Sequence, residues 1–226
     1  MASEVDIVNL ALSHLGDTAT VASLYPPEGS TQAELAARFY PIARDSLLEL
    51  HTWSFAMRRE NLAALTNVSD QWQYTYAMPN NVAQIVSIIP STAKDDYSVH
   101  VDPLTAFGFP YNIDSMAVAT AYVPQAYDIE TLSDGTRVIR TNQESAMARF
   151  VALITDTTKF SPLFTMALSW HLASMLAGPI LKGDVGSAEA KRCLQQMQIY
   201  LSQAKTSDAD QRDIKPNHIV SWVVGR

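Results

Sequence analysis

Histidine is the residue type with the widest chemical range in this sequence, because imidazole can bind metals or move protons near neutral pH. The chain has five histidines, and none lies four residues from another histidine or from the single cysteine. A local zinc site is therefore not predicted, and the phosphate-binding, dinucleotide-binding and serine-hydrolase motifs are absent too. His171, within an apolar helical segment, could act as a general base. The favoured interpretation is a core or interface histidine with a hydrogen-bonded ring, and we expect no cofactor and no metal.

Paired carboxylates could supply the acid and the base of a glycosidase. The candidates are Asp95 with Asp96, and Asp208 with Asp210. Both pairs stand in turn-like sequence, where acids usually form a solvated face, and that interpretation is favoured. Cys193 stands beside Arg192, which could lower the pKa of its thiol, but an inert, half-buried cysteine is the favoured interpretation.

Arg58 and Arg59 follow Trp53 and Phe55 closely and form the only compact basic and aromatic cluster. Such a cluster could bind nucleic acid, with arginine on phosphate and aromatic rings on bases. The favoured alternative places both aromatic residues in the core as structural anchors, with the arginines, Arg59 included, in ion pairs within or between subunits. Two arginines in an acidic chain are weak support for nucleic-acid binding.

The composition is unusual mainly in its small charged fraction. The chain has 226 residues and a net charge of −7, with 47% hydrophobic but only 17% charged residues. A surface with so few charges must be polar and uncharged, or be covered by a partner. The apolar content excludes a disordered chain, the single cysteine excludes a disulfide scaffold, and the acidic balance argues against coating nucleic acid. The content of aromatic residues and methionine favours an oligomer with much subunit-covered surface.

Targeting and membrane signals are not predicted either. The amino terminus carries acids where a signal peptide would carry Lys or Arg. The most apolar stretch, 163–181, is interrupted by polar residues, glycine and proline, so we expect no spanning helix and synthesis in the cytoplasm.

Helices are predicted at both ends of the chain. Ser3 and Asp6 form a capping-box-like pair before a first helix that stops at Gly16. Thr31 and Glu34 open a second helix, in which Pro41 predicts a kink or a short break. Its expected apolar face comprises Leu35, Phe39, Ile42, Ala43, Leu47 and Leu50.

Two further helices are predicted after the middle of the chain. Ser161 caps the first, with Pro162 in its opening turn, and Gly178-Pro179 and Gly183 end it. Ser187 opens the last helix, whose expected apolar line comprises Ala190, Leu194, Met197, Leu201 and Ala204.

The middle of the chain has the period of strands. Alternation over 72–78, the β-branched run 82–89 and the segment 147–153 each predict a strand. Asp134-Gly135 predicts the turn of a hairpin that joins 127–132 to 136–141. We therefore expect an α+β fold, with a helical bundle layer from residues 1–54 and 159–207, a β-rich domain over 55–158 and an extended C-terminal arm over 208–226.

One long run resembles a known family. Residues 43–64 are similar to the hallmark of the tail tubular protein A family, the head-to-tail adaptors of T7-like short-tailed bacteriophages. The similarity continues in order through the middle of the chain and into the later helices. The residues that carry it are Val8–Leu12, Leu15-Gly16, Arg44-Asp45, His51, Trp53, Phe55-Ala56, Arg59, Leu62-Ala63, Tyr74, Tyr76, Pro79, Phe160–Phe164, Ala167-Leu168 and Leu172-Ala173.

The resemblance implies a structural virion protein of the phage tail, located at the head–tail junction and made in the bacterial host, with no catalysis. Members of the family form dodecameric rings beneath the portal protein, hold the nozzle (a tubular protein B-like partner) and surround the channel through which double-stranded DNA leaves. Tail fibres are a further possible partner, and no membrane is involved. The alternative is a virion-associated hydrolase of cell-wall or capsule polysaccharide that uses Asp95 and Asp96.

Two further expectations concern anchoring. The arm would dock on a neighbouring subunit or on the portal through its apolar residues Ile219, Val220, Trp222, Val223 and Val224. Trp53 and Phe55 would fasten the helical layer to the β-rich part.

Overall fold

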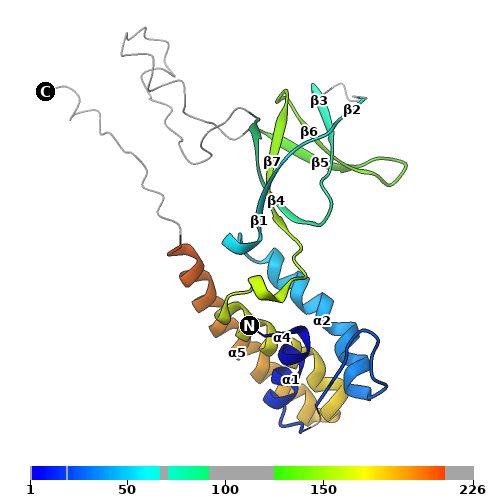
Figure 1. Ribbon diagram of the computed structural model, residues 1–226, viewed down its shortest axis with the longest axis vertical. Helices are drawn as coiled ribbons and strands as arrows, with labels where there is room; N and C mark the ends of the chain where they lie inside the picture. The colour runs from blue at the N-terminus through cyan, green and yellow to red at the C-terminus, as the bar shows by residue number, and fades with distance from the viewer. Residues whose placement is uncertain (1, 19, 67–70, 92–124, 212–226) are drawn as a thin grey trace, which may run out of the picture. The chain divides into compact units, whose positions relative to one another are not determined.

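The computed structural model describes residues 2–18, 20–66, 71–91 and 125–211 (Figure 1). Within them, helices at both ends of the chain flank two antiparallel sheets, which confirms the predicted α+β fold. The chain divides into a helical unit, Met1–Met57 with Val151–Arg212, and a strand unit that includes Arg58–Phe150. The predicted boundaries stood at residues 54 and 159.

Helix α1 (Glu4–His14) begins with the predicted capping box. The Asp6 backbone N–H donates to Ser3 Oγ at 3.1 Å, and the Ser3 N–H donates to Asp6 Oδ2 at 2.8 Å. These two bonds satisfy donors that the first turn of a helix leaves without partners. Gly16, with φ of 73°, follows the end of the helix, as a left-handed stop requires.

Helix α2 (Thr31–Glu49) differs from its prediction at both its cap and its middle. Ser30 is the N-cap residue, because its side chain accepts the Ala33 N–H, so Thr31 lies inside the helix. The helix runs through Pro41, so the short break, one of the two effects predicted for this proline, does not occur. Proline removes the N–H that would bond to the carbonyl of Ala37, and the Tyr25 hydroxyl donates to that carbonyl at 3.2 Å. A residue outside the helix thus replaces the missing bond.

The predicted apolar face of α2 is wrong in part. Ile42 and Leu50 are 55% and 51% exposed, whereas small residues occupy much of the buried side. Alanine has little apolar surface, so it contributes weakly to a hydrophobic pattern even where close packing buries it completely. The buried residues are Ala33, Ala36, Tyr40, Ala43, Arg44, Leu47 and Leu48.

Helix α4 (Pro162–Leu181) is the central helix of its unit. It begins at the predicted Ser161 cap, continues past Gly178-Pro179 and ends at Leu181. Of the two predicted stops, Gly178-Pro179 is wrong and Gly183, with φ of 57°, lies just beyond the end. By length and composition it could cross a membrane. However, eight of its residues are buried and it packs against α1, α2 and α5, which is the pattern of a core helix.

Helix α5 (Gly183–Ala209) begins earlier and ends later than predicted. It starts at Gly183 rather than Ser187, and it includes Asp208 and Ala209, so the expected extended arm does not begin at residue 208. Gly186 permits close packing on α4, since a Cβ there would lie 2.9 Å from the Ala177 carbonyl oxygen. The predicted apolar line holds for Met197, Leu201 and Ala204, but Leu194 is 40% exposed and Cys193 is buried in its place.

The strand unit contains two sheets. One has the order β1-β7-β4, formed by Met57–Asn61, Ala146–Ala152 and Val82–Pro90. The other has the order β2-β3-β6-β5, formed by Ala64–Leu65, Tyr74–Ala77, Arg137–Thr141 and Tyr127–Thr131.

The predicted hairpin is confirmed. β5 and β6 pair antiparallel with Ile129 opposite Ile139. In the turn, Gly135 has φ of 84° and the Asp134 carboxylate accepts the Thr136 N–H at 2.9 Å. The predicted strands over 72–78, 82–89 and 147–153 correspond to β3, β4 and β7.

Candidate functional site

Of the two aromatic anchors predicted from sequence, Trp53 lies in the core of the helical unit and Phe55 is half-buried beside it. Trp53 is fully buried, and its indole N–H donates to the Leu47 carbonyl at 2.9 Å. The Trp53 ring contacts the Phe164 ring of α4 edge-on, with 5.0 Å between the ring centroids. The Phe55 ring also contacts the Phe164 ring, at 5.2 Å. Phe160 completes this aromatic cluster at 4.9 Å from Phe164. These contacts join the turn after α2 to the first turn of α4, inside one unit, whereas we had expected Trp53 and Phe55 to fasten the helical layer to the β-rich part.

Beside the aromatic cluster, a buried carboxylate joins the end of α5 to the same turn. Asp208 is only 5% exposed, and its Oδ1 accepts both the Ser54 N–H at 2.9 Å and the Ser54 hydroxyl at 2.5 Å. Its Oδ2 lies 3.3 Å from His51 Nε2. We call these three residues, His51, Ser54 and Asp208, the Asp208 junction. Asp208 stands more than 150 positions from the other two residues in the sequence.

The junction contains the three residue types of a serine-hydrolase triad, but the hydrogen bonds connect them in a different order. In a nucleophilic triad, histidine lies between serine and the acid, so that imidazole takes the serine proton. Here the carboxylate lies between the other two, and the serine hydroxyl donates directly to it. A carboxylate is a weak base for a hydroxyl proton, so this arrangement suits holding two chain segments together.

A second polar cluster joins three helices. The ring of His14, at the end of α1, stacks on Trp170 of α4 at 3.6 Å and lies 3.1 Å from Ser169 Oγ through its Nε2. The guanidinium group of Arg192, on α5, lies over the Trp170 ring at 5.4 Å. It also donates a hydrogen bond to the His14 carbonyl at 3.0 Å. Glu189 pairs with Arg192. Burial, and secondarily the charge of Arg192, lowers the pKa of His14 to about 4.

We expect this histidine to make stability fall with acidity. The unfolded chain takes up a proton near its ordinary pKa of 6.5, and the folded chain does so only near 4, so stability is lost as pH falls through that interval. A full shift of that size corresponds to roughly 3 kcal/mol. Because the ring is only half-buried, solvent screening reduces the expected loss to about 1–2 kcal/mol.

Urea unfolding near neutral pH and near pH 4, on the wild type and a His14→Gln variant, measures this effect. Glutamine can still bond to Ser169 but does not titrate, so the variant should lose less stability than the wild type on acidification. Equal losses in the two proteins would contradict the assignment. The carboxylates shared by both proteins cancel in the comparison.

The remaining histidine of the helical unit has the predicted role. His171 of α4 lies 3.0 Å from the Ser46 hydroxyl of α2 through its Nε2, and burial lowers its pKa. The prediction of a histidine with a hydrogen-bonded ring is confirmed. Cys193 is buried, and burial raises the pKa of its thiol, as expected for an inert cysteine.

The other sequence candidates do not form a site among the described residues. Asp208 is buried and Asp210 is exposed, so these two acids do not act as a pair. Arg58 and Arg59 are both exposed on β1. In the part of the chain that the structure describes, no group of three or more histidines, cysteines or acids could hold a metal ion.

Several predicted residues lie outside the described part of the chain. They are the acids Asp95 and Asp96, and the arm residues Ile219, Val220, Trp222, Val223 and Val224.

Sequence reasoning missed the Asp208 junction and the His14 cluster. No local signal could have found them, because each depends on helices that are distant in sequence. The described residues define a two-unit α+β chain in which buried polar side chains hold helices and turns together. No family model matches the chain, and a search of curated proteins also finds no match.

Proposed function

We propose that the protein is a structural virion component, a ring-forming adaptor between the portal and the tail nozzle of a short-tailed bacteriophage. The observation that carries the proposal is the ordered set of residues between Val8 and Ala173 that resembles the tail tubular protein A family. The ring, with twelve copies by analogy, surrounds the channel through which the genome leaves. The protein acts in the tail at the head–tail junction and catalyses no reaction.

The positions of these residues support the proposal. Arg44 is 8% exposed and bonds to Asp45 at 2.8 Å, Trp53 and Phe55 belong to the aromatic cluster, and His51 belongs to the Asp208 junction. A resemblance concentrated in such packing residues points to a common architecture rather than a common ligand site.

The charge of the chain fits a conduit for DNA. Each copy carries a formal charge of −7. A ring of such subunits would repel the phosphate backbone, whereas a basic wall would release counterions and hold the duplex. Double-stranded DNA therefore passes through without specific binding.

Electron microscopy and native mass spectrometry of the purified protein, alone and mixed with its portal protein, test the proposal. We expect closed rings, either free or on the portal. The control is the portal protein measured alone. Its mass and its outline are subtracted from those of the mixture to reveal the added ring. A chain that stays monomeric in both samples would overturn the proposal.

A further inference from the structure

Helix α5 has one exposed face that carries no charge. From Cys193 to Ala204 the sequence contains no acidic or basic residue, although Arg192 and Lys205 flank the run. The buried residues of this stretch recur with a helical period and leave six exposed ones on the opposite side. We call these six the α5 face: Leu194, Gln195, Gln198, Ile199, Ser202 and Gln203.

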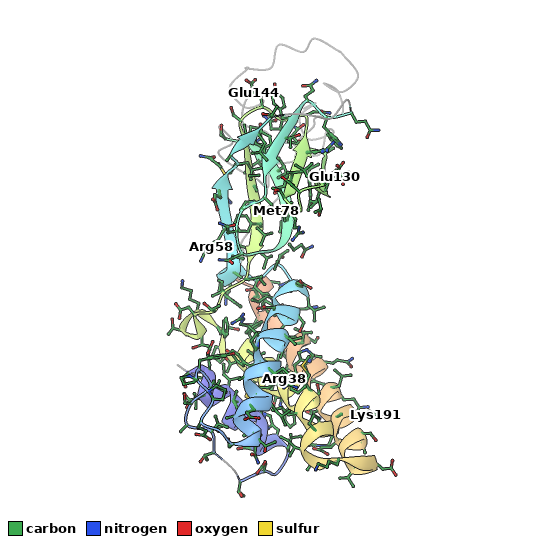
Figure 2. All side chains as sticks on the ribbon, turned by 90° about the vertical axis from the view of Figure 1, so that its right-hand side faces the viewer. Arg38, Arg58, Met78, Glu130, Glu144 and Lys191 are labelled. Carbon is green, nitrogen blue, oxygen red and sulfur yellow. The ribbon has the colours of Figure 1, made fainter. Side chains whose placement is uncertain are left out.

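The α5 face presents both apolar side chains and side-chain amides to solvent. Ile199 is 50% exposed and Leu194 is 40% exposed. Surface helices ordinarily present charged residues to water, as Lys191, labelled in Figure 2, does one turn earlier. Loss of charge at the centre of a surface is the compositional mark of a protein interface.

We propose that the α5 face binds a second copy of this chain and forms the centre of the contact between neighbouring subunits of the ring. This inference rests on the proposed function. Two copies each carry a net charge of −7, so a contact between them must avoid placing like charges together. A basic partner would instead be recognised through acidic residues. Glutamine amides can donate and accept hydrogen bonds without the desolvation cost of burying an ion.

The size of the face indicates its place in the contact. Twelve helical residues span about 18 Å, and a helix is roughly 10 Å wide, so the face covers about 200 Å². A stable interface buries about 800 Å² on each partner. The α5 face is therefore the centre of a larger contact, to which other parts of the subunit contribute.

The helical unit also offers a second surface for the other side of the contact. α4 packs against both α5 and α2, and α5 and α2 lie on different sides of it (Figures 1 and 2). On α2, Ile42 is 55% exposed, and Leu50 at its end is 51% exposed. A ring needs contacts between two different surfaces of each subunit. The α5 face of one copy against Ile42 and Leu50 of the next meets that requirement.

The first test places a charge in the face. An Ile199→Asp variant should need at least a tenfold higher concentration to assemble than the wild type, measured by sedimentation velocity and native mass spectrometry. Ile129→Asp is the matched control, because Ile129 is also an exposed isoleucine but lies on β5, outside the helical unit. It should assemble as the wild type does. Circular dichroism and thermal unfolding check that both variants are folded.

The outcomes separate this inference from the proposed function. If the wild type assembles and Ile199→Asp assembles equally well, the α5 face is not the subunit contact, and the ring proposal stands. If the wild type never assembles, with or without portal, both proposals are overturned.

The second test identifies the occupant. In a Cys193→Ser background, a double variant with Ile42→Cys and Ile199→Cys should form a ladder of disulfide-linked oligomers on mild oxidation. Each single variant should give no ladder, because the contact joins two different surfaces. A second double variant, in the same background, carries Ile199→Cys and Trp222→Cys. A disulfide within one chain of this variant would show that the chain's own C-terminal segment covers the face, and would overturn the inference.

Discussion

A Trp53→Ala variant should lose about 3–5 kcal/mol of unfolding free energy, the range for deleting a buried aromatic side chain. The substitution removes the hydrogen bond to the Leu47 carbonyl and the edge contact with Phe164. It also leaves a cavity between the turn after α2 and the first turn of α4. Because α4 packs against three other helices, the loss should spread through the helical unit. Urea unfolding followed by tryptophan fluorescence and circular dichroism measures it.

Two companion variants make this result specific. Trp53→Phe keeps most of the ring packing but loses the indole N–H, so it should cost roughly 1–2 kcal/mol, the value of a buried hydrogen bond and a small cavity. Ile129→Ala, at a partly exposed position on β5, should stay within about 0.5 kcal/mol of the wild type. A Trp53→Ala protein with wild-type stability would show that the aromatic cluster does not hold the helical unit together.

An Asp208→Ala variant should lose about 2–3 kcal/mol. It leaves the Ser54 N–H without its acceptor in a part-buried site, while the Ser54 hydroxyl keeps only Gln211 Oε1 at 3.1 Å. A buried donor without a partner costs roughly 1–3 kcal/mol. The pairing of Asp208 with His51 at 3.3 Å is lost as well. Hydrogen exchange should show faster exchange of the Ser54 amide, together with fraying of the last turn of α5.

Asp210→Ala is the matched control for this variant. Asp210 lies two residues further along, carries the same charge and is exposed. Its replacement should change stability by no more than about 0.5 kcal/mol. If the two alanine variants behave alike, Asp208 contributes only as a surface acid, and the junction has no structural role.

Features that depend on neighbouring residues could be predicted from the amino-acid sequence. The Ser3–Asp6 capping box, the Ser161 cap with Pro162 and the Asp134-Gly135 hairpin all form as predicted. Each is a short-range arrangement in which a side chain or a positive φ satisfies backbone groups within about four residues. The separation of helical ends from a strand-rich middle was also predictable, because the two structures have different hydrophobic periods.

The buried side of each helix and the pairing of polar side chains depend on long-range packing, and local sequence patterns do not predict them. Tyr25 lets α2 continue through Pro41 by bonding to the Ala37 carbonyl, which no local pattern indicates. Burial depends on the partner that packs against a helix, so Ile42 and Leu194 are exposed although their sequence pattern suggested the core. The sequence pattern predicted that Asp208 is one of two solvated acids. In the structure, Asp208 accepts the Ser54 N–H because the end of α5 packs against the turn at Ser54. Such contacts join residues far apart in the chain, and the free energy that selects them comes from packing the whole unit.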